Sequence, residues 1–366
     1  MKITAIEAIP YTIPYRRPLK FASGEVTEAD HVLIRVHTDA GITGVSDTPP
    51  RPYTYGETQG SIISVVKDVF APQMIGMDPF AREAARSIMG RTLNNATAKG
   101  SVDIALWDIV GQALETPVFR LLGGFTDRLR VSHMLGFKEA AALVDEAQQM
   151  RDRYGITAFK LKVGRTPTSL DMGAARALRE ALGEGAELYL DANRGWSASE
   201  AGAVLAEAAE LGMQFLEEPN DAAEHLGRRW LTSRSPIPIA ADESAPDLAS
   251  AARELVTSGA DLVAVKTART GFTESSRIVG LAEGLGVELY LGNQIDTQVG
   301  TAASVAFGAA FEATSRRAAE LSNFLDMADD LMADPLQIVE GHVRAREAPG
   351  VGNSVDADKL AHYRTD

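Results

Sequence analysis

The spacing of apolar and polar residues changes near residue 130. Before it, the alternating segments 1–13 and 31–50 predict the strands of a small meander, with residues 38–41 as a turn. The segment 16–31 between them is polar and contains glycine, so we expect a loop there. Apolar residues recur at spacings of three and four in three further segments, which predicts helices at 61–76, 78–91 and 96–115, with Leu-Leu-Gly-Gly at 121–124 ending the last.

After residue 130, short β-rich runs alternate with alanine-rich helical stretches. Eight runs begin near residues 130, 159, 188, 215, 238, 262, 287 and 319. Successive starts lie 23 to 32 residues apart, the size of one strand plus one helix. Eight such units predict a closed parallel barrel. An open doubly wound sheet is the alternative, and it is disfavoured because no GxGxxG motif follows the first unit.

Composition narrows the class of protein. The 366 residues exceed what one compact core usually holds, which suggests two domains or a large barrel with an addition. The net charge of −14 argues against a nucleic-acid or anionic-membrane partner. The absence of cysteine excludes disulfides and thiolate chemistry. The first residues lack the apolar core of a signal peptide, and no apolar run is long enough to span a bilayer, so we expect a cytoplasmic protein.

Three consecutive predicted strands end in a carboxylate, at Asp191, Glu217 and Asp242. Catalytic residues of such barrels stand at the C-terminal ends of strands. A single carboxylate there is most often a helix cap, and the adjacent Glu218 and Glu243 can be read as salt-bridge partners. Three in succession predict a site for a hard divalent cation such as Mg²⁺, which neutralises their charge and prefers oxygen ligands. Zinc is disfavoured because the six histidines show no HxxxH spacing.

Lysines flank these carboxylates. Lys160 and Lys162 alternate along one strand and therefore point the same way, and Lys266 lies on the sixth strand, across the barrel. A lone pair of this kind is a weak signal, since edge strands also carry lysines. Here the neighbouring charge and partial desolvation are expected to lower a lysine pKa toward the useful range. The set predicts proton transfer next to a carboxylate, through a stabilised enolate.

The motifs that carry these residues are similar to those of one family. They are AKGSVDIALWDIVGQALETPVFRLLGG, KLK, LDAN, EEP, ADES and VKTARTG. In order and spacing the chain resembles the enolase superfamily, specifically its muconate lactonizing enzyme subgroup. The resemblance implies an α/β fold, a (β/α)7β TIM-like barrel with an α+β capping domain. Residues 1–125 would form the cap, completed by 326–366, and residues 126–325 the catalytic barrel.

The resemblance also implies a metal centre. Asp191, Glu217 and Asp242 would hold Mg²⁺ or Mn²⁺, with Asn193 and Glu243 as supporting residues behind them. Members of this family are usually homo-oligomers, which we expect here as well.

Roles for the three lysines follow from the same resemblance. Lys162 would be the acid/base, with Lys160 tuning it. Lys266, paired with Glu243, would face Lys162 from the other side. The seventh strand carries no histidine, unlike the mandelate racemase branch, which places the chain with the enzymes that use two lysines. Only one glycine stands in TARTGF where much of the subgroup has two, so the loop after the sixth strand is expected to differ.

Similarity in further short segments indicates the class of substrate, a small dianionic carboxylate. RRPLKFASGEV, RPYTYGETQ, SHMLGF, GNQID and LSNFLDM resemble muconate cycloisomerases of the anti-addition type. One carboxylate of cis,cis-muconate would sit on the metal while the other closes the lactone. Substrate contacts are expected from Lys20, Phe21, Arg51, Tyr55, Asn293, Gln294 and Glu320. The alternatives are an N-acylamino acid racemase, a dipeptide epimerase, an o-succinylbenzoate synthase, or a non-catalytic metal-binding relative.

Overall fold

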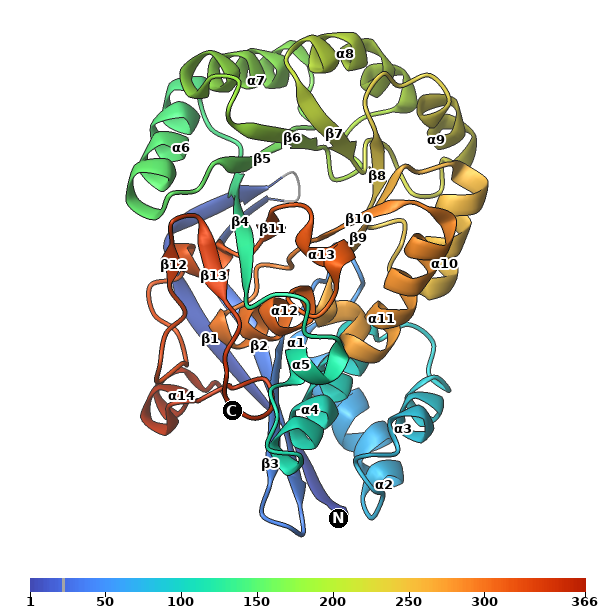
Figure 1. The fold of residues 1–366 in the computed structure, drawn as a ribbon, viewed down its shortest axis with the longest axis vertical. Helices are drawn as coiled ribbons and strands as arrows, with labels where there is room; N and C mark the ends of the chain where they lie inside the picture. The colour runs from blue at the N-terminus through green and yellow to red at the C-terminus, as the bar shows by residue number, and fades with distance from the viewer. Residues whose placement is uncertain (22–23) are drawn as a thin grey trace.

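The chain folds into a barrel and a smaller α+β part that packs against one end of it (Figure 1). The computed structural model describes residues 1–21 and 24–366, and the side chains of residues 1–18 and 26–366. No helix in these ranges combines the length and apolarity needed to cross a bilayer.

A three-stranded antiparallel sheet opens the chain: β1 (Ile3–Phe21), β2 (Gly24–Thr38) and β3 (Thr43–Thr48). The predicted turn after Thr38 is confirmed, but the loop expected at 16–31 is wrong. Both arms continue as strands, because their backbone groups pair with each other as far as Phe21 and Gly24 whatever the polarity of the side chains. The register shifts between Pro14 and Leu19, a stretch that includes Pro18, which has no N–H to donate.

Helices cover one face of this sheet (Figure 1). They are α1 (Gln59–Ser64), a π-helical segment η1 (Val65–Phe70), α2 (Ala71–Met74), α3 (Arg82–Met89), α4 (Ala96–Ala113) and α5 (Val118–Leu122). The predicted helical segments are thus confirmed, except that the glycines at 123–124 end the separate short helix α5 and not α4. Helix α4 is apolar nearly all round and packs against both β3 and the barrel helix α11 (Thr267–Leu285).

Eight parallel strands form the barrel. They are β4 (Arg128–Leu135), β5 (Ala158–Lys162), β6 (Glu187–Asp191), β7 (Met213–Glu217), β8 (Ile239–Ala241), β9 (Leu262–Val265), β10 (Glu288–Leu291) and β11 (Ala319–Glu320). They hydrogen-bond in chain order from β4 to β10, and β11 returns to pair with β4, which brings the last strand back to the first. All eight predicted strands are present, and the closed barrel is confirmed over the open sheet.

The connections between these strands are helical and lie on the outside. They are α6 (Ala140–Tyr154), α7 (Ser169–Leu182), α8 (Ala198–Glu210), α9 (His225–Thr232), α10 (Leu248–Arg253) with the π-helical η2 (Glu254–Ser258), α11, and α12 (Gln298–Gly308) with α13 (Glu312–Ser315). Seven strand–helix units and a closing strand make this a (β/α)7β barrel, with the N-terminal part as its cap.

Aromatic side chains fill the inside of the barrel below the strand ends. Tyr189 stacks on Phe215 with ring centroids 4.4 Å apart, and Phe215 lies 5.0 Å from the ring of Tyr290. Tyr189 and Phe215 each precede an inward-facing carboxylate by two residues on the same strand. Because inward positions recur every second residue, the next inward layer holds the polar residues at the barrel mouth.

The C-terminal segment divides its contacts between the two parts. Strands β12 (Ile338–Val339) and β13 (His342–Arg344) form a hairpin that pairs with β4 of the barrel. The 3₁₀ helix η3 (Asn323–Asp326) follows β11, and α14 (Ala357–Tyr363) lies beside β1 of the cap (Figure 1). Contact with the cap was expected of the tail, whereas the hairpin on the barrel was not. The division of the chain at 125 and 325 stays a prediction.

A buried aspartate joins the cap to the barrel. Asp103 of α4 accepts hydrogen bonds from the backbone N–H groups of Phe272 (2.7 Å) and Thr273 (2.9 Å) and from the Thr273 hydroxyl (2.6 Å). It thereby caps the part of α11 that restarts after Gly271, where the backbone leaves helical geometry with φ 61°. A Cβ on Gly271 would lie 2.5 Å from Asp103 Oδ2, so only glycine fits this junction.

We expect Asp103→Ala to lower the free energy of unfolding by about 2–3 kcal/mol, because it leaves buried donors of α11 without acceptors. Denaturant titration of both proteins measures the change. Asp39→Ala is the matched control, since Asp39 accepts one backbone N–H, from Lys2, at the surface (2.8 Å). Equal losses in the two variants would contradict the role given to Asp103.

Candidate active site

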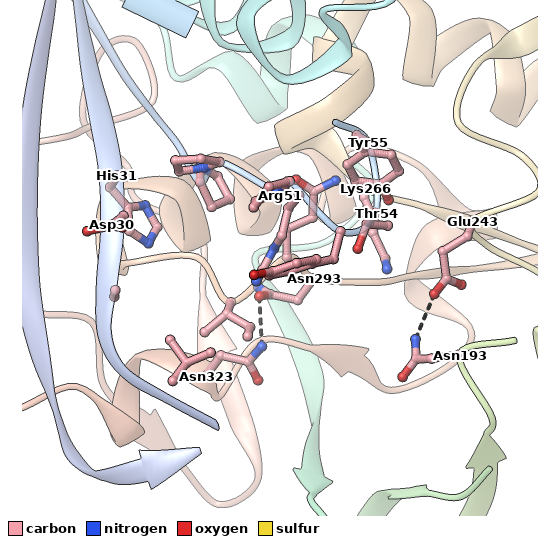
Figure 2. A pocket seen from close by; sticks show the side chains of 18 of the residues that line it. Asp30, His31, Arg51, Thr54, Tyr55, Asn193, Glu243, Lys266, Asn293 and Asn323 are labelled. Carbon is pink, nitrogen blue, oxygen red and sulfur yellow. Dashed lines mark hydrogen bonds between the residues drawn. The ribbon is translucent and has the colours of Figure 1, made fainter. Parts of the chain in front are cut away.

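A cavity of about 710 Å³ lies between the C-terminal ends of the barrel strands and the cap. The barrel contributes Lys160, Lys162, Asn193, Glu243 and Lys266 to its wall. The cap contributes residues of β2 and the loop of residues 49–60. Figure 2 shows the Asn193–Glu243 pair on one side of this cavity and Asp30 and His31 on the other.

Backbone register brings the three predicted metal ligands to one level. Lys162 pairs with Asp191 across β5 and β6, and Asp191 pairs with Glu217 across β6 and β7. Asp242 follows directly after β8, the next strand. All three carboxylates are fully buried. The sequence therefore placed them correctly at three neighbouring strand ends.

The turns after β6 and β7 separate these carboxylates from their polar neighbours. Asn193 and Glu218 adopt positive φ values of 41° and 39°, uncommon for residues other than glycine. Glu218 consequently points away from Glu217 and accepts from Arg228 Nη2 (2.6 Å), the backbone N–H of Asp242 (2.7 Å) and the Ser244 hydroxyl (2.9 Å). Glu218 thus has the salt-bridge role that we considered for it, and it fixes the backbone that carries Asp242.

Lys160 and Lys162 point into the same interior, as the alternation predicted. Lys160 Nζ lies 2.8 Å from Asp191 Oδ2, 2.9 Å from Glu217 Oε1 and 2.8 Å from Glu320 Oε1. Lys162 Nζ donates to Asp191 Oδ2 at 2.6 Å and to Asn193 Oδ1 at 2.5 Å. Each lysine is therefore held by carboxylates or an amide and not left beside the other as bare like charge.

This arrangement corrects the expected effect on Lys160. Burial by itself lowers the pKa of Lys160, but the nearby carboxylates of Asp191, Glu217 and Glu320 together raise it well above its ordinary value. The expected lowering is therefore wrong for Lys160, because carboxylates from three other strands contact its ammonium directly.

The carboxylates respond in opposite directions. Burial raises the pKa of Asp191, but Lys160 and Lys162 outweigh it and bring it below its ordinary value. Burial and the negative charge of Asp191 raise the pKa of Glu217 well above its usual range. The site thus contains more buried negative charge than its lysines compensate, and Glu217 bears the excess.

Lys266 pairs with Asp242 and not with Glu243 as expected. Glu243 instead accepts a hydrogen bond from Asn193 Nδ2 at 2.8 Å (Figure 2). The difference follows from alternation along the strand end, since Asp242 points inward toward Lys266 and Glu243 sideways toward β6. Burial and the charge of Asp242 raise the pKa of Glu243 to about 7.

Arg269 is a residue at this site that the sequence analysis missed. Its Nη1 donates to Asp242 Oδ1 at 2.9 Å and to the Tyr55 hydroxyl at 2.8 Å. It therefore joins a predicted metal ligand to the cap loop. The available signal was its position three residues after Lys266, one helical turn into α11, where it lies over the same strand end.

The predicted substrate-contacting residues are partly located. Arg51, Tyr55, Asn293, Gln294 and Glu320 all line the cavity, whereas the side chains of Lys20 and Phe21 lie outside the described residues. Asn293 Oδ1 accepts from Asn323 Nδ2 at 2.8 Å, which orients its amide (Figure 2). The contacts of these residues with a substrate stay predictions.

The carboxylates suit a divalent cation by their chemistry. Within residues 1–21 and 24–366, no three acidic, histidine or cysteine side chains already surround one point as a metal site, because lysine ammonium groups lie against the carboxylates. The donor set of Asp191, Glu217 and Asp242 nevertheless consists of hard oxygens from adjacent strands. Glu217 Oε2 is buried and accepts no hydrogen bond from a described residue, although Lys160 Nζ lies 2.8 Å from it. A divalent ion at this oxygen would take the place of that ammonium contact.

Models of known protein families cover both parts of the chain. Residues 4–123 match the mandelate racemase / muconate lactonizing enzyme N-terminal domain, and residues 142–359 match the enolase C-terminal domain-like family. The chain belongs to the enolase superfamily. It is therefore an enzyme of that superfamily, with the muconate lactonizing enzyme group as its relatives.

Three relatives illustrate the range of the group. A crystal structure of muconate lactonizing enzyme from Mycobacterium smegmatis, complexed with muconolactone, is 55% identical with a TM-score of 0.98 over 100% of both chains. Chloromuconate cycloisomerase CbnB from Cupriavidus necator is 29% identical over 99% of each chain. L-Ala-D/L-Glu epimerase from Bacillus subtilis is 30% identical over 84% of this chain and 85% of its own. Enolase-superfamily enzymes generally use a divalent metal, which agrees with the carboxylate set found here.

A second cluster of acids lies behind the cavity on the cap side. Asp296 follows β10 and is buried, and its Oδ1 has no hydrogen-bond partner among the described residues. Burial and the charge of Asp47 raise the pKa of Asp296 to about 7. This carboxyl group is therefore protonated in the folded protein at pH values where the unfolded chain has already lost the proton.

The pH dependence of stability follows from that difference. Between about pH 4 and about pH 7 the folded state binds more protons at Asp296, so stability falls as pH rises through this window. Asp296→Asn removes the titration. We expect its free energy of unfolding, relative to the wild type, to increase by up to about 4 kcal/mol between the two ends of the window. Denaturant titrations at both ends measure this double difference, with exposed Asp78→Asn as control. A difference independent of pH would contradict the assignment.

Proposed function

We propose that this enzyme is a muconate cycloisomerase that converts cis,cis-muconate to muconolactone, with Mg²⁺ or Mn²⁺ as its metal. What carries the proposal is the full-length likeness, at 55% identity, to a muconate lactonizing enzyme whose structure contains muconolactone. The solved epimerase structures are 26–27% identical, well below that value. The reaction converts one small dianion and one proton, which comes in the end from solvent, into a monoanionic lactone, and it needs no other reactant.

The charges around the cavity support a dianionic substrate. On the barrel side stand Lys160, Lys162 and Lys266. On the cap side stands Arg51, whose pKa burial lowers and which forms no ion pair within the described residues. An arginine in this position is well suited to bind the second carboxylate of the substrate.

Different residues of the cavity would carry out the separate steps of this reaction. Arg51 would orient the far carboxylate so that its oxygen forms a bond to the carbon β to the other carboxylate. Lys162 would then give a proton from its ammonium group to the α-carbon, which completes the lactone, and would later regain a proton from solvent. Lys160 keeps Lys162 and the carboxylates in place through its contacts with Asp191 and Glu217.

A divalent cation held by Asp191, Glu217 and Asp242 would supply positive charge that stabilises the enolate. Arg269 and Glu218 would keep Asp242 oriented for this, through the side chain and the backbone respectively. Asn193, bonded to both Lys162 and Glu243, would hold the acid/base in position.

Epimerisation of a dipeptide or acylated amino acid is the second candidate. It is favoured by the presence of lysines on opposite sides of the barrel, Lys162 on β5 and Lys266 after β9, and by the 30% identical epimerase. In that reaction both lysines exchange a proton with the same carbon, one from each face.

The first test is the loss of muconate absorbance with Mn²⁺ present. We expect turnover by the wild type, its loss on addition of chelator, and its return when Mn²⁺ is added back in excess. Lys162→Ala should lower kcat by roughly 10²- to 10⁴-fold, because no other group delivers the proton. Lys67→Ala, at an exposed lysine of the cap, is the control and should not change the rate. Full activity of Lys162→Ala would refute the assignment of the acid.

Lys266→Ala separates the two candidates. In a cycloisomerase it should leave measurable lactonization, since the proton comes from Lys162. In an epimerase it should abolish racemisation, which needs both faces. Muconate turnover and deuterium exchange into a dipeptide panel, followed in parallel by NMR, measure both. Exchange with a dipeptide that disappears in either lysine variant, without any turnover of muconate, would favour the epimerase.

A further inference from the structure

One histidine of the cap faces the cavity. His31 lies on β2 and is only 1% exposed, yet its ring forms part of the cavity wall (Figure 2). Its Nδ1 lies 2.9 Å from Asp47 Oδ2, a fully buried carboxylate on β3. A buried aspartate behind a histidine fixes which ring nitrogen is available on the other side.

Asp47 and the His31 ring are held firmly. Asp47 Oδ1 accepts from the Tyr11 hydroxyl at 2.8 Å, and Oδ2 accepts from the Thr297 hydroxyl at 2.7 Å. The Tyr11 ring packs against His31 with centroids 5.6 Å apart. Gln59 Nε2 donates to the His31 carbonyl at 2.9 Å, which fixes the backbone as well. The ring therefore cannot turn without breaking this network.

The other nitrogen, Nε2, is left to the cavity. No hydrogen bond joins it to any residue in the described part of the chain. With Nδ1–H donating to Asp47, a neutral ring presents a lone pair at Nε2, which suits an N–H or O–H group. A protonated ring presents an N–H donor there, which suits a carboxylate.

We propose that His31, positioned by Asp47, is a specificity-determining residue that binds the far carboxylate of a dianionic substrate beside Arg51. The inference rests on the proposed function and names the residue that distinguishes diacids from monoacids at the same site. Figure 2 shows His31 on the side of the cavity away from Asn193 and Glu243, so a carboxylate placed at His31 lies at the far end of a ligand whose other end meets the lysines.

Calorimetric titration with adipate and hexanoate tests the proposal. Both are unreactive six-carbon acids, and they differ by one carboxylate. In excess Mg²⁺, the wild type should bind adipate more tightly than hexanoate. His31→Gln should weaken adipate binding by roughly tenfold or more and leave hexanoate little changed. An unchanged adipate preference in His31→Gln, or a wild type without any preference, overturns the proposal.

Two further variants distinguish the positioning of the His31 ring by Asp47 from a general disturbance of the buried network around it. Asp47→Asn should reduce the adipate preference, because the His31 ring loses the carboxylate that fixes its orientation. Tyr11→Phe removes one hydrogen bond to the same carboxylate without exposing a new group to the cavity, and it should leave the preference near that of the wild type. A loss in Tyr11→Phe equal to that in Asp47→Asn overturns the role of Asp47.

The same measurements distinguish this inference from the proposed function. Because neither acid reacts, a wild type that does not turn over muconate but shows an adipate preference that is lost in His31→Gln contradicts the proposed function alone. Muconate turnover combined with unaltered adipate binding by His31→Gln sinks this inference alone.

Discussion

Buried charge at the mouth of the barrel is the constraint around which the rest of the molecule is arranged. Asp191, Glu217 and Asp242 have no exposed surface, and each is contacted by a lysine from within the barrel. Ionised groups in such surroundings are stable only with close, well-directed partners. The left-handed turns at Asn193 and Glu218 and the buried Arg228 and Arg269 supply that direction from the surrounding backbone and helices.

The cap completes this arrangement by contacting the same groups from above. Tyr55 reaches Arg269, which holds Asp242, while Asp103 of α4 caps the second part of the helix that carries Arg269. A change at the interface between cap and barrel can therefore reach Asp242, a predicted metal ligand, through one helix. The groups proposed for specificity, Arg51 and His31, come from the cap, and the groups proposed for proton transfer come from the barrel. Substrate specificity and proton transfer could thus change separately while the fold stays the same.

The barrel and the position of the polar residues at its strand ends were largely predictable, because both follow from short-range patterns. Strand spacing gave all eight strands, and alternation gave the inward direction of Lys160 and Lys162. The errors arose where the outcome depends on which backbone or side-chain groups pair with each other, which the pattern of residue types does not record. The 16–31 hairpin depends on pairing between its own two arms, the partner of Lys266 depends on how two adjacent residues turn at one strand end, and the effect on Lys160 depends on three carboxylates from three strands. Arg269 and His31 were missed for the same reason, since neither stands at a strand end of the barrel.

The aromatic rings below the polar layer restrict the routes by which small molecules can enter and leave the cavity. Tyr189, Phe215 and Tyr290 close the bore of the barrel with stacked and tilted rings, so that end offers no passage. Reactant and product must therefore use the same route, between the cap and the C-terminal ends of the barrel strands. Each product molecule has to leave the cavity before the next reactant enters, so the residence time of the product depends on the cap residues that cover the cavity as well as on the groups that carry out the reaction.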